Sequence, residues 1–214
     1  MIVERHRGTA AELHGLEMPD DGQRRVWHLA VSEPAVVLGS TQADDVVDAA
    51  VARDRGVEVA RRRSGGGAVW VAPDDTIWLD VLIPRDDPAW DDDVGRSFLP
   101  IGRAWSTALE VVGVAGTRVH EGPLVRTVWS EAVCFAGIGP GEVLLGDAKV
   151  VGISQRRTRA GARFQCAVPR TWDPEPLRSL LVPPPPVVEL ADLATGVGPV
   201  DLDALVEALV AALV

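Results

Sequence analysis

Three scarcities limit what this protein can be. Only two cysteines occur among 214 residues, too few for a disulfide framework. No apolar run reaches the length of a membrane span, and the start, MIVERHRGTAAEL, lacks the apolar stretch of a signal peptide. Cations are also scarce, because 21 Lys and Arg face 31 Asp and Glu, and the net charge of −10 argues against a general nucleic-acid binder. We therefore expect a cytoplasmic protein that binds neither nucleic acid nor membrane.

Two further absences concern chemistry. The four histidines (His6, His14, His28 and His120) are scattered and show no metal-ligand spacing, so no metal site is predicted. The triple glycine at 65–67 is not followed by Gly-Lys-Ser/Thr and forms no G-x-G-x-x-G pattern. The sequence therefore has neither a P-loop nor a dinucleotide-binding fingerprint.

Lysine is the scarcest charged residue, because Lys149 is the only one beside twenty arginines. A GC-rich coding sequence would explain the arginines but not this exception. An ammonium is a compact, mobile charge with three donors, whereas a guanidinium is a rigid plane. A confined pocket that places a small cation beside a carboxyl or phosphate oxygen would resist the exchange, so Lys149 is our first candidate catalytic residue.

The remaining pattern predicts one substantial α+β domain, and 47% of the residues are apolar. Helices are predicted at 44–56, from near residue 100 to 113, and at 200–214, the last with Asp201 as its cap. Strands are predicted at 24–31, 34–40, 57–62, 131–137, 142–146, 149–154 and 163–169, and within 70–84 on both sides of a turn at 73–75. Because hairpins and helix-separated strands both occur, we expect a mixed or antiparallel sheet.

The stretch ARRRSGGGAV (60–69) is a candidate binding loop. Three glycines remove every side chain from a piece of backbone, which permits positive φ and lets main-chain N–H groups approach a ligand. Three arginines, separated from the glycines only by Ser64, add positive charge, so recognition of a carboxylate or phosphate is a natural use. The alternative is a flexible hairpin with exposed arginines.

The stretch GDAKVVGISQRR (146–157) is predicted to begin with a turn at Gly-Asp-Ala, which makes the strands 142–146 and 149–154 a hairpin. The second strand begins at Lys149. Strict alternation would place Lys149 on the same face as Val151 and Ile153, and opposite Gly152 and Ser154. A glycine inside a strand indicates a close approach to the backbone there.

These two stretches together resemble the lipoate–protein ligase A family, which carries similar Arg-Arg-x-Ser-Gly-Gly-Gly-Ala-Val and Lys-x-x-Gly-x-x-Gln-Arg blocks. PAVVLGSTQ (34–42) is similar to a third block, and the resemblance covers about residues 24 to 182. It implies the fold of biotin/lipoate protein ligase catalytic domains, a mixed, largely antiparallel central sheet flanked by helices, with an acyl chain in a tunnel. The implied catalytic domain is 1–182, with 183–214 as a Pro-rich connector and a C-terminal helix packed on it.

The resemblance also implies roles for individual residues. Lys149 would meet the acyl carboxyl, or the phosphate of an acyl-adenylate, inside the tunnel. The implied substrate-binding residues are Arg62, Ser64, Gly65, Gly66, Gly67, Ala68, Gly152, Ser154 and Arg156.

The stretch AVCFAGIGPGEVLLGDAK (132–149) is similar to the branch of the family that carries the acyl group on a cysteine. Cys134 precedes Lys149 by fifteen residues, with Glu142 between them. The leading hypothesis is transfer of a lipoyl or octanoyl group through Cys134, from an acyl carrier protein to a lysine of a lipoyl carrier domain, without a cofactor. The alternative is an ATP-dependent lipoate–protein ligase that uses ATP and Mg. A third possibility is a non-catalytic acyl-ligand binder.

Departures from the family pattern support keeping that third possibility. The His-Asp or His-Glu pair usual after the glycine loop is absent from VWVAPDD. RFQCAV stands where His-Gly is common, with Cys166 at the histidine-like position, and Ile153 stands where Ser is usual. Both cysteines fall in predicted apolar strands, where a cysteine is by default a small buried hydrophobe.

Overall fold

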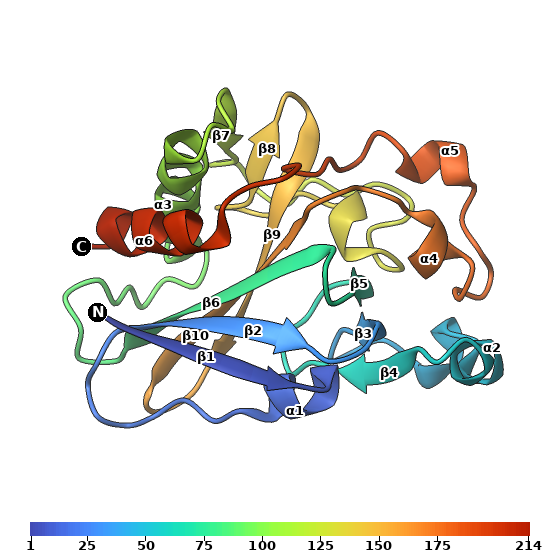
Figure 1. Ribbon diagram of the computed structural model, residues 1–214, viewed down its shortest axis with the longest axis horizontal. Helices are drawn as coiled ribbons and strands as arrows, with labels where there is room; N and C mark the ends of the chain where they lie inside the picture. The colour runs from blue at the N-terminus through green and yellow to red at the C-terminus, as the bar shows by residue number, and fades with distance from the viewer.

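A seven-stranded sheet forms the centre of the computed structural model, which describes residues 1–214 (Figure 1). Its strands are, in spatial order, β1 (Ile2–Gly8), β2 (Arg25–Val31), β6 (Thr76–Pro84), β10 (Gly161–Pro169), β9 (Ala148–Arg157), β8 (Val143–Leu145) and β7 (Thr117–Val119). Every adjacent pair is antiparallel except β1 and β2. The predicted α+β fold with a largely antiparallel sheet is confirmed.

A second, three-stranded sheet lies beside the first, in the order β4 (Glu58–Arg61), β3 (Ala35–Leu38) and β5 (Val69–Val71). β3 is parallel to β4 and antiparallel to β5. Residues 73–75 do form a turn as predicted, but the strands on its two sides, β5 and β6, belong to different sheets.

Two helices, α3 (Phe98–Val111) and α6 (Leu202–Ala212), cover one face of the large sheet (Figure 1). Their apolar sides join a core cluster of 21 buried residues that includes Trp105, which is completely buried. The side chain of Asp201 accepts hydrogen bonds from the first-turn amides of Asp203 and Ala204, so the predicted cap of the closing helix is confirmed.

The opposite face is covered by α1 (Ala10–Gly15) and the small sheet, which share a second core cluster around Trp27 and Trp78. Thr9 and Glu12 form a capping box that starts α1. The remaining helices are α2 (Ala49–Asp54), α4 (Glu175–Arg178) and α5 (Val187–Leu190), together with two 3-10 turns, η1 (Asp44–Val46) and η2 (Cys134–Ala136). No helix is both long enough and apolar enough to cross a membrane.

The prediction of a strand at 131–137 is wrong, because this segment forms a short bridge and then η2. The amide of Ala68 donates to Ala132, and the amide of Cys134 donates to Ala68. These two bonds form a single bridge between Ala68 and Val133, and the chain then turns into η2 instead of continuing as a strand. The helix predicted at 44–56 is also interrupted, since η1 and α2 are separate.

The segment after the proline run pairs with the start of β9, beyond the point where the ladder between β9 and β10 ends. Leu193 accepts a hydrogen bond from the amide of Lys149, and the amide of Thr195 donates to the carbonyl of Lys149. The main chain of the only lysine is therefore held on this side by the C-terminal segment, and α6 follows directly.

Candidate functional site

The glycine loop between β4 and β5 has a shape that depends on Arg62. This buried guanidinium donates to the carbonyls of Val37 at 3.1 Å, Gly65 at 2.8 Å and Gly67 at 2.8 Å. Gly66 adopts φ +102°, which favours glycine. Arg62 thus organises the loop from behind.

Gly67 is required for a different reason. A Cβ at this position would lie 2.7 Å from the main-chain nitrogen of Val133 and 2.8 Å from that of Cys134. The loop therefore lies directly against the segment that carries the cysteine. Ala68 is buried and contributes its backbone bonds to the same contact.

Lys149 reaches this region because β9 carries a bulge. Leu144 pairs with Lys149 and the preceding Val143 pairs with Val151, so Val150 is an extra residue without a partner. A bulge reverses the direction of the side chains beyond it. The side chains of Val150 and Val151 both enter the core under α3. The side chain of Lys149 faces the other side of the sheet. The predicted alternation, which placed Lys149 with Val151, is wrong at this point.

The ammonium of Lys149 is almost completely buried, with 1% of the side chain exposed. Nζ lies 2.9 Å from Oε2 of Glu142 and donates at 2.8 Å to the carbonyl oxygen of Cys134. It also lies 5.2 Å from the ring centre of Phe135. Phe135 in turn explains the glycine in β9, because a Cβ on Gly152 would lie 3.3 Å from this ring.

A cavity of about 560 Å³ joins the cysteine, the lysine and the glycine loop. Its lining includes Gly65, Gly66, Gly67, Cys134, Glu142, Lys149 and Ser154. Cys134 is half-buried, and a Cβ on Gly66 would lie 3.8 Å from its Sγ. The volume is in the range of small-molecule sites. A thiol, an ammonium and a loop of bare backbone therefore meet in one place.

A smaller cavity of about 40 Å³ adjoins the first and shares Cys134, Ile153 and Ser154 with it. Most of its other walls are apolar: Val69, Val71, Trp78, Phe135 and Ala167. His14, Arg62, Gln165 and Cys166 also line it. Of the predicted substrate-binding residues, Arg62 and Gly152 belong to this smaller cavity.

A chain of hydrogen bonds links the glycine loop to α1, and the sequence pattern gave little sign of it. Ser64 Oγ lies 2.9 Å from Ser154 Oγ and donates at 2.8 Å to Gln165 Oε1. Gln165 Nε2 lies 2.8 Å from His14 Nδ1. The two serines belong to recognisable blocks, whereas nothing near His14 or Gln165 in the sequence indicates a site.

Cys166, expected at a histidine-like position, faces the other side of the sheet. Its side chain packs in the core under α3, and burial, with a contribution from the charge of Asp80, raises the pKa of this thiol well above its usual value. Cys166 and the preceding residue Gln165 both line the smaller cavity, but of the two only the Gln165 side chain joins the hydrogen-bond chain to Ser64 and His14.

His14 makes the stability of the protein depend on pH. Burial, and next the charges of Arg163 and Arg62, lower the pKa of His14 to about 3 from the ordinary 6.5. The unfolded chain takes up a proton below pH 6.5 and the folded protein does not, so this residue destabilises the fold as pH falls from 6.5 towards 3. Between about pH 7 and 5 we expect wild type to lose about 2 kcal/mol more unfolding free energy than His14→Gln. Urea titrations at each pH measure this difference, and equal losses would contradict it.

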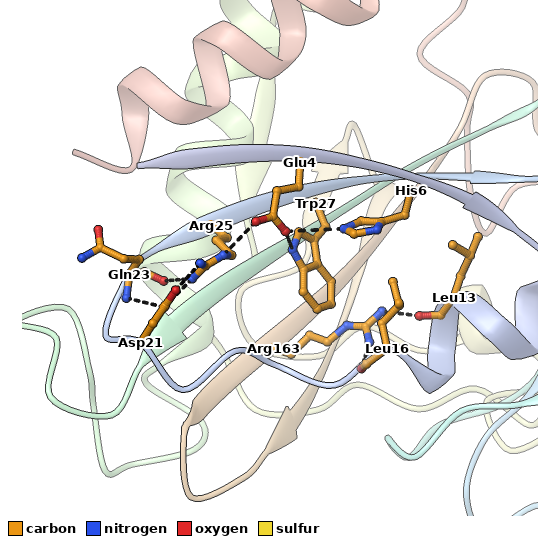
Figure 2. Close-up of polar contacts among 9 residues, drawn as sticks. All are labelled: Glu4, His6, Leu13, Leu16, Asp21, Gln23, Arg25, Trp27 and Arg163. Atoms are coloured by element: carbon orange, nitrogen blue, oxygen red, sulfur yellow. Dashed lines mark hydrogen bonds and ion pairs between the residues drawn. The ribbon is translucent and has the colours of Figure 1, made fainter.

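Arg163 holds the helix that carries His14. Its side chain is buried, pairs with Asp80 at 2.6 Å, and donates to the carbonyls of Leu13 and Leu16 at 2.9 Å each. Figure 2 shows its contacts with Leu13 in α1 and with Leu16 directly after this helix. The guanidinium lies 4.9 Å from the ring centre of Trp27. Arg163 is therefore part of the internal framework.

The other predicted arginines point away from the cavities. Arg156 lies inside β9 and pairs with Glu17 at 3.0 Å, as Arg63 does at 2.7 Å. Arg61 pairs with Asp44. The structure thus brings the predicted site residues together around the two cavities, with two exceptions. Ala68 lies behind the glycine loop, and Arg156 lies outside the site. No group of three His, Cys, Asp or Glu side chains is placed to hold a metal ion.

The fold is that of the lipoate protein ligases. The crystal structure of lipoate-protein ligase A bound with ATP is 17% identical, with a TM-score of 0.74 over 99% of this chain and 83% of that chain. A bi-partite lipoate protein ligase from Thermoplasma acidophilum is also 17% identical, with a TM-score of 0.72 over 99% of this chain and 81% of that one.

Residues 12–214 match the family model of the lipoyl protein ligase A/B catalytic domain, and the chain belongs to this family. The resemblance seen in the sequence is confirmed. Octanoyltransferase LipM of Clostridioides difficile (strain 630) is 27% identical over 127 residues, and LipM of Moorella thermoacetica (strain ATCC 39073 / JCM 9320) is 28% identical over 129 residues. These matches cover 58% and 60% of this chain, which spans about half the length of the two relatives, 46% of each.

Proposed function

We propose that this protein is an acyltransferase that moves an octanoyl or lipoyl group to a lysine of a lipoyl carrier domain through Cys134. The observation that carries the proposal is the single cavity shared by the Cys134 thiol, the Lys149 ammonium and the backbone of Gly65–Gly67. The family and the LipM relatives support the same chemistry.

In the first step, Cys134 attacks the thioester of an acyl carrier protein. Its sulfur bonds to the acyl carbon as the carrier's carbon–sulfur bond breaks, and the thiol proton of Cys134 passes to the departing sulfur. Two N–H donors of Lys149 are engaged by Glu142 and the Cys134 carbonyl, and the third can stabilise negative charge that develops on the acyl oxygen. The apolar walls of the smaller cavity suit the carbons of the acyl chain next to the thioester, although its volume of about 40 Å³ is too small for a whole octanoyl chain.

In the second step, the amine of the recipient lysine attacks the acyl-enzyme. A carbon–nitrogen bond forms, the bond to the Cys134 sulfur breaks, and one amine proton returns to that sulfur. The reaction exchanges a thioester for an amide and requires no nucleotide or other cofactor.

ATP-dependent ligation is the second candidate, because the fold is shared with an ATP-bound ligase over almost the whole chain. Two carboxylates line the large cavity, and both are engaged: Glu142 by Lys149 and two backbone amides, and Glu131 by Arg126 at 3.5 Å. The residues therefore suit Mg²⁺ poorly. We therefore favour transfer without nucleotide.

Intact-mass analysis separates the two candidates. After incubation with octanoyl carrier protein alone, we expect an octanoyl adduct on the enzyme that hydroxylamine removes, and this adduct should pass to an added lipoyl domain. If the lipoyl domain is modified only when free lipoate and ATP are both present, the protein is a ligase. If neither condition modifies the lipoyl domain, the chain is a binding protein.

A further inference from the structure

Lys149 is too deeply buried to keep its charge without a fixed counter-charge. Removing an ammonium from water costs several kcal/mol unless an opposite charge and hydrogen bonds replace the solvent. With 1% of its side chain exposed, Lys149 has one carboxylate within reach, that of Glu142, which is itself only 7% exposed. The two charges form an isolated buried pair at the wall of the large cavity.

Glu142 is in turn held by two backbone amides. Oε2, which contacts Lys149, also accepts from the amide of Gly139 at 2.6 Å, and Oε1 accepts from the amide of Ile153 at 3.1 Å. These amides lie on either side of the pair, in the loop before β8 and in β9. These amides therefore fix the position of the carboxylate, and Glu142 is the one carboxylate with which the Lys149 ammonium can pair.

The bond to Ile153 also explains why β8 can be so short. The ladder between β8 and β9 ends where Val143 pairs with Val151. Glu142, the next residue back along the chain, supplies its side chain in place of a backbone partner, so the Ile153 amide remains satisfied. The bulge directs the Lys149 side chain towards the cavity, and the contact with Glu142 fixes the position of its ammonium group.

We propose that Glu142 is a positioning residue: its carboxylate holds the Lys149 ammonium against the carbonyl of Cys134, so that one N–H remains directed at the acyl oxygen during transfer. The predicted effect of Glu142 on turnover rests on the proposed acyl transfer. Its predicted effect on the position of the Lys149 ammonium does not. Glu142 acts through Lys149 and touches no substrate atom.

The lysine count makes a direct test possible. Labelling with ¹⁵N-lysine gives a protein with one side-chain ammonium signal, because Lys149 is the only lysine. In wild type, burial and the bonds to Glu142 and Cys134 should slow proton exchange enough for this signal to be observed. In Glu142→Gln, which keeps the size but not the charge, we expect the signal to vanish or move, while backbone spectra remain those of a folded protein.

The same variants should differ in turnover. Glu142→Gln should lower kcat for octanoyl transfer by about ten- to a hundredfold, with KM for the carrier changed less than about threefold, because only the transition-state contact is displaced. Glu142→Asp keeps the charge on a shorter arm and should recover part of the loss. Glu207→Gln, on the exposed side of α6, is the matched control and should resemble wild type in both measurements.

Two outcomes would overturn the inference. One is an unchanged ammonium signal in Glu142→Gln, and the other is transfer at the wild-type rate by that variant. Should Glu142→Gln fail to fold, Glu142→Asp carries the test, and a wild-type signal and rate in that variant would argue against a requirement for this exact placement. A wild-type enzyme that forms no acyl adduct would refute the proposed function alone, because the ammonium signal does not depend on acyl chemistry.

Discussion

Replacing Lys149 with arginine is expected to slow acyl transfer by about a hundredfold or more, although the positive charge is kept. The ammonium fits between Glu142, the Cys134 carbonyl and the face of Phe135, with almost no exposed surface. A guanidinium is larger and planar, so it would displace one of these neighbours or leave the position from which a donor reaches the acyl oxygen. Steady-state transfer from octanoyl carrier protein to a lipoyl domain measures the loss.

Arg103→Lys makes the reverse exchange at an exposed pair with Glu121 and should leave transfer unchanged. Backbone spectra or thermal unfolding of Lys149→Arg would separate a misplaced donor from a damaged fold. If Lys149→Arg turned over at a near-normal rate, the single lysine would be an accident of composition, and the proposed role of its ammonium would fail.

The features predicted correctly from the sequence all have local causes. The turn at Gly146 and Asp147 joins β8 and β9 as a hairpin, and Asp201 caps α6, because both depend on residues within a few positions. The close approach of backbone at the glycine loop also has a local cause, because residues 65–67 carry no side chains that would prevent it. These signals located the loop and the lysine.

The errors have non-local causes. Strict alternation along β9 fails at Lys149 because the bulge is defined by pairing with β8, and one strand alone does not reveal an extra residue. The neighbours of Cys134 are apolar and suggest a strand, yet its amide is taken by Ala68, far away in the chain. His14 meets Gln165 only through the packing of α1 on the sheet.

The family resemblance succeeds where periodicity does not. It groups Ser64 of one block with Lys149 and Ser154 of another, and the two serines are hydrogen-bonded across 90 residues of sequence. It assigns Arg62 to substrate binding, and in the structure this residue both shapes the glycine loop and lines the smaller cavity. A sequence block identifies which residues belong together, but the division between contact and support requires the geometry.

Replacing Cys134 with alanine is expected to abolish both the covalent octanoyl adduct and transfer to a lipoyl domain, and added ATP should restore neither. We do not expect the other thiol to take over: Cys166 also lines the smaller cavity, but its side chain is fully buried in the core under α3 and burial raises its pKa. The substitution should not disturb the lysine, since Lys149 contacts the main-chain carbonyl of residue 134 and not its sulfur. Intact-mass measurement and a transfer assay, each with and without ATP and lipoate, provide the test.

Cys166→Ala is the matched control and should still form the adduct, with at most a modest loss of activity from the missing sulfur in the core. A ligase would show the opposite dependence: Cys134→Ala would remain active, and modification of the lipoyl domain would require ATP with free lipoate. If Cys166→Ala were inactive and Cys134→Ala active without ATP, the mechanism would still use a cysteine, but the nucleophile would be Cys166 and not Cys134. That result is unexpected, because Cys134 lines both cavities at the glycine loop, whereas Cys166 lines only the smaller one and its side chain packs under α3.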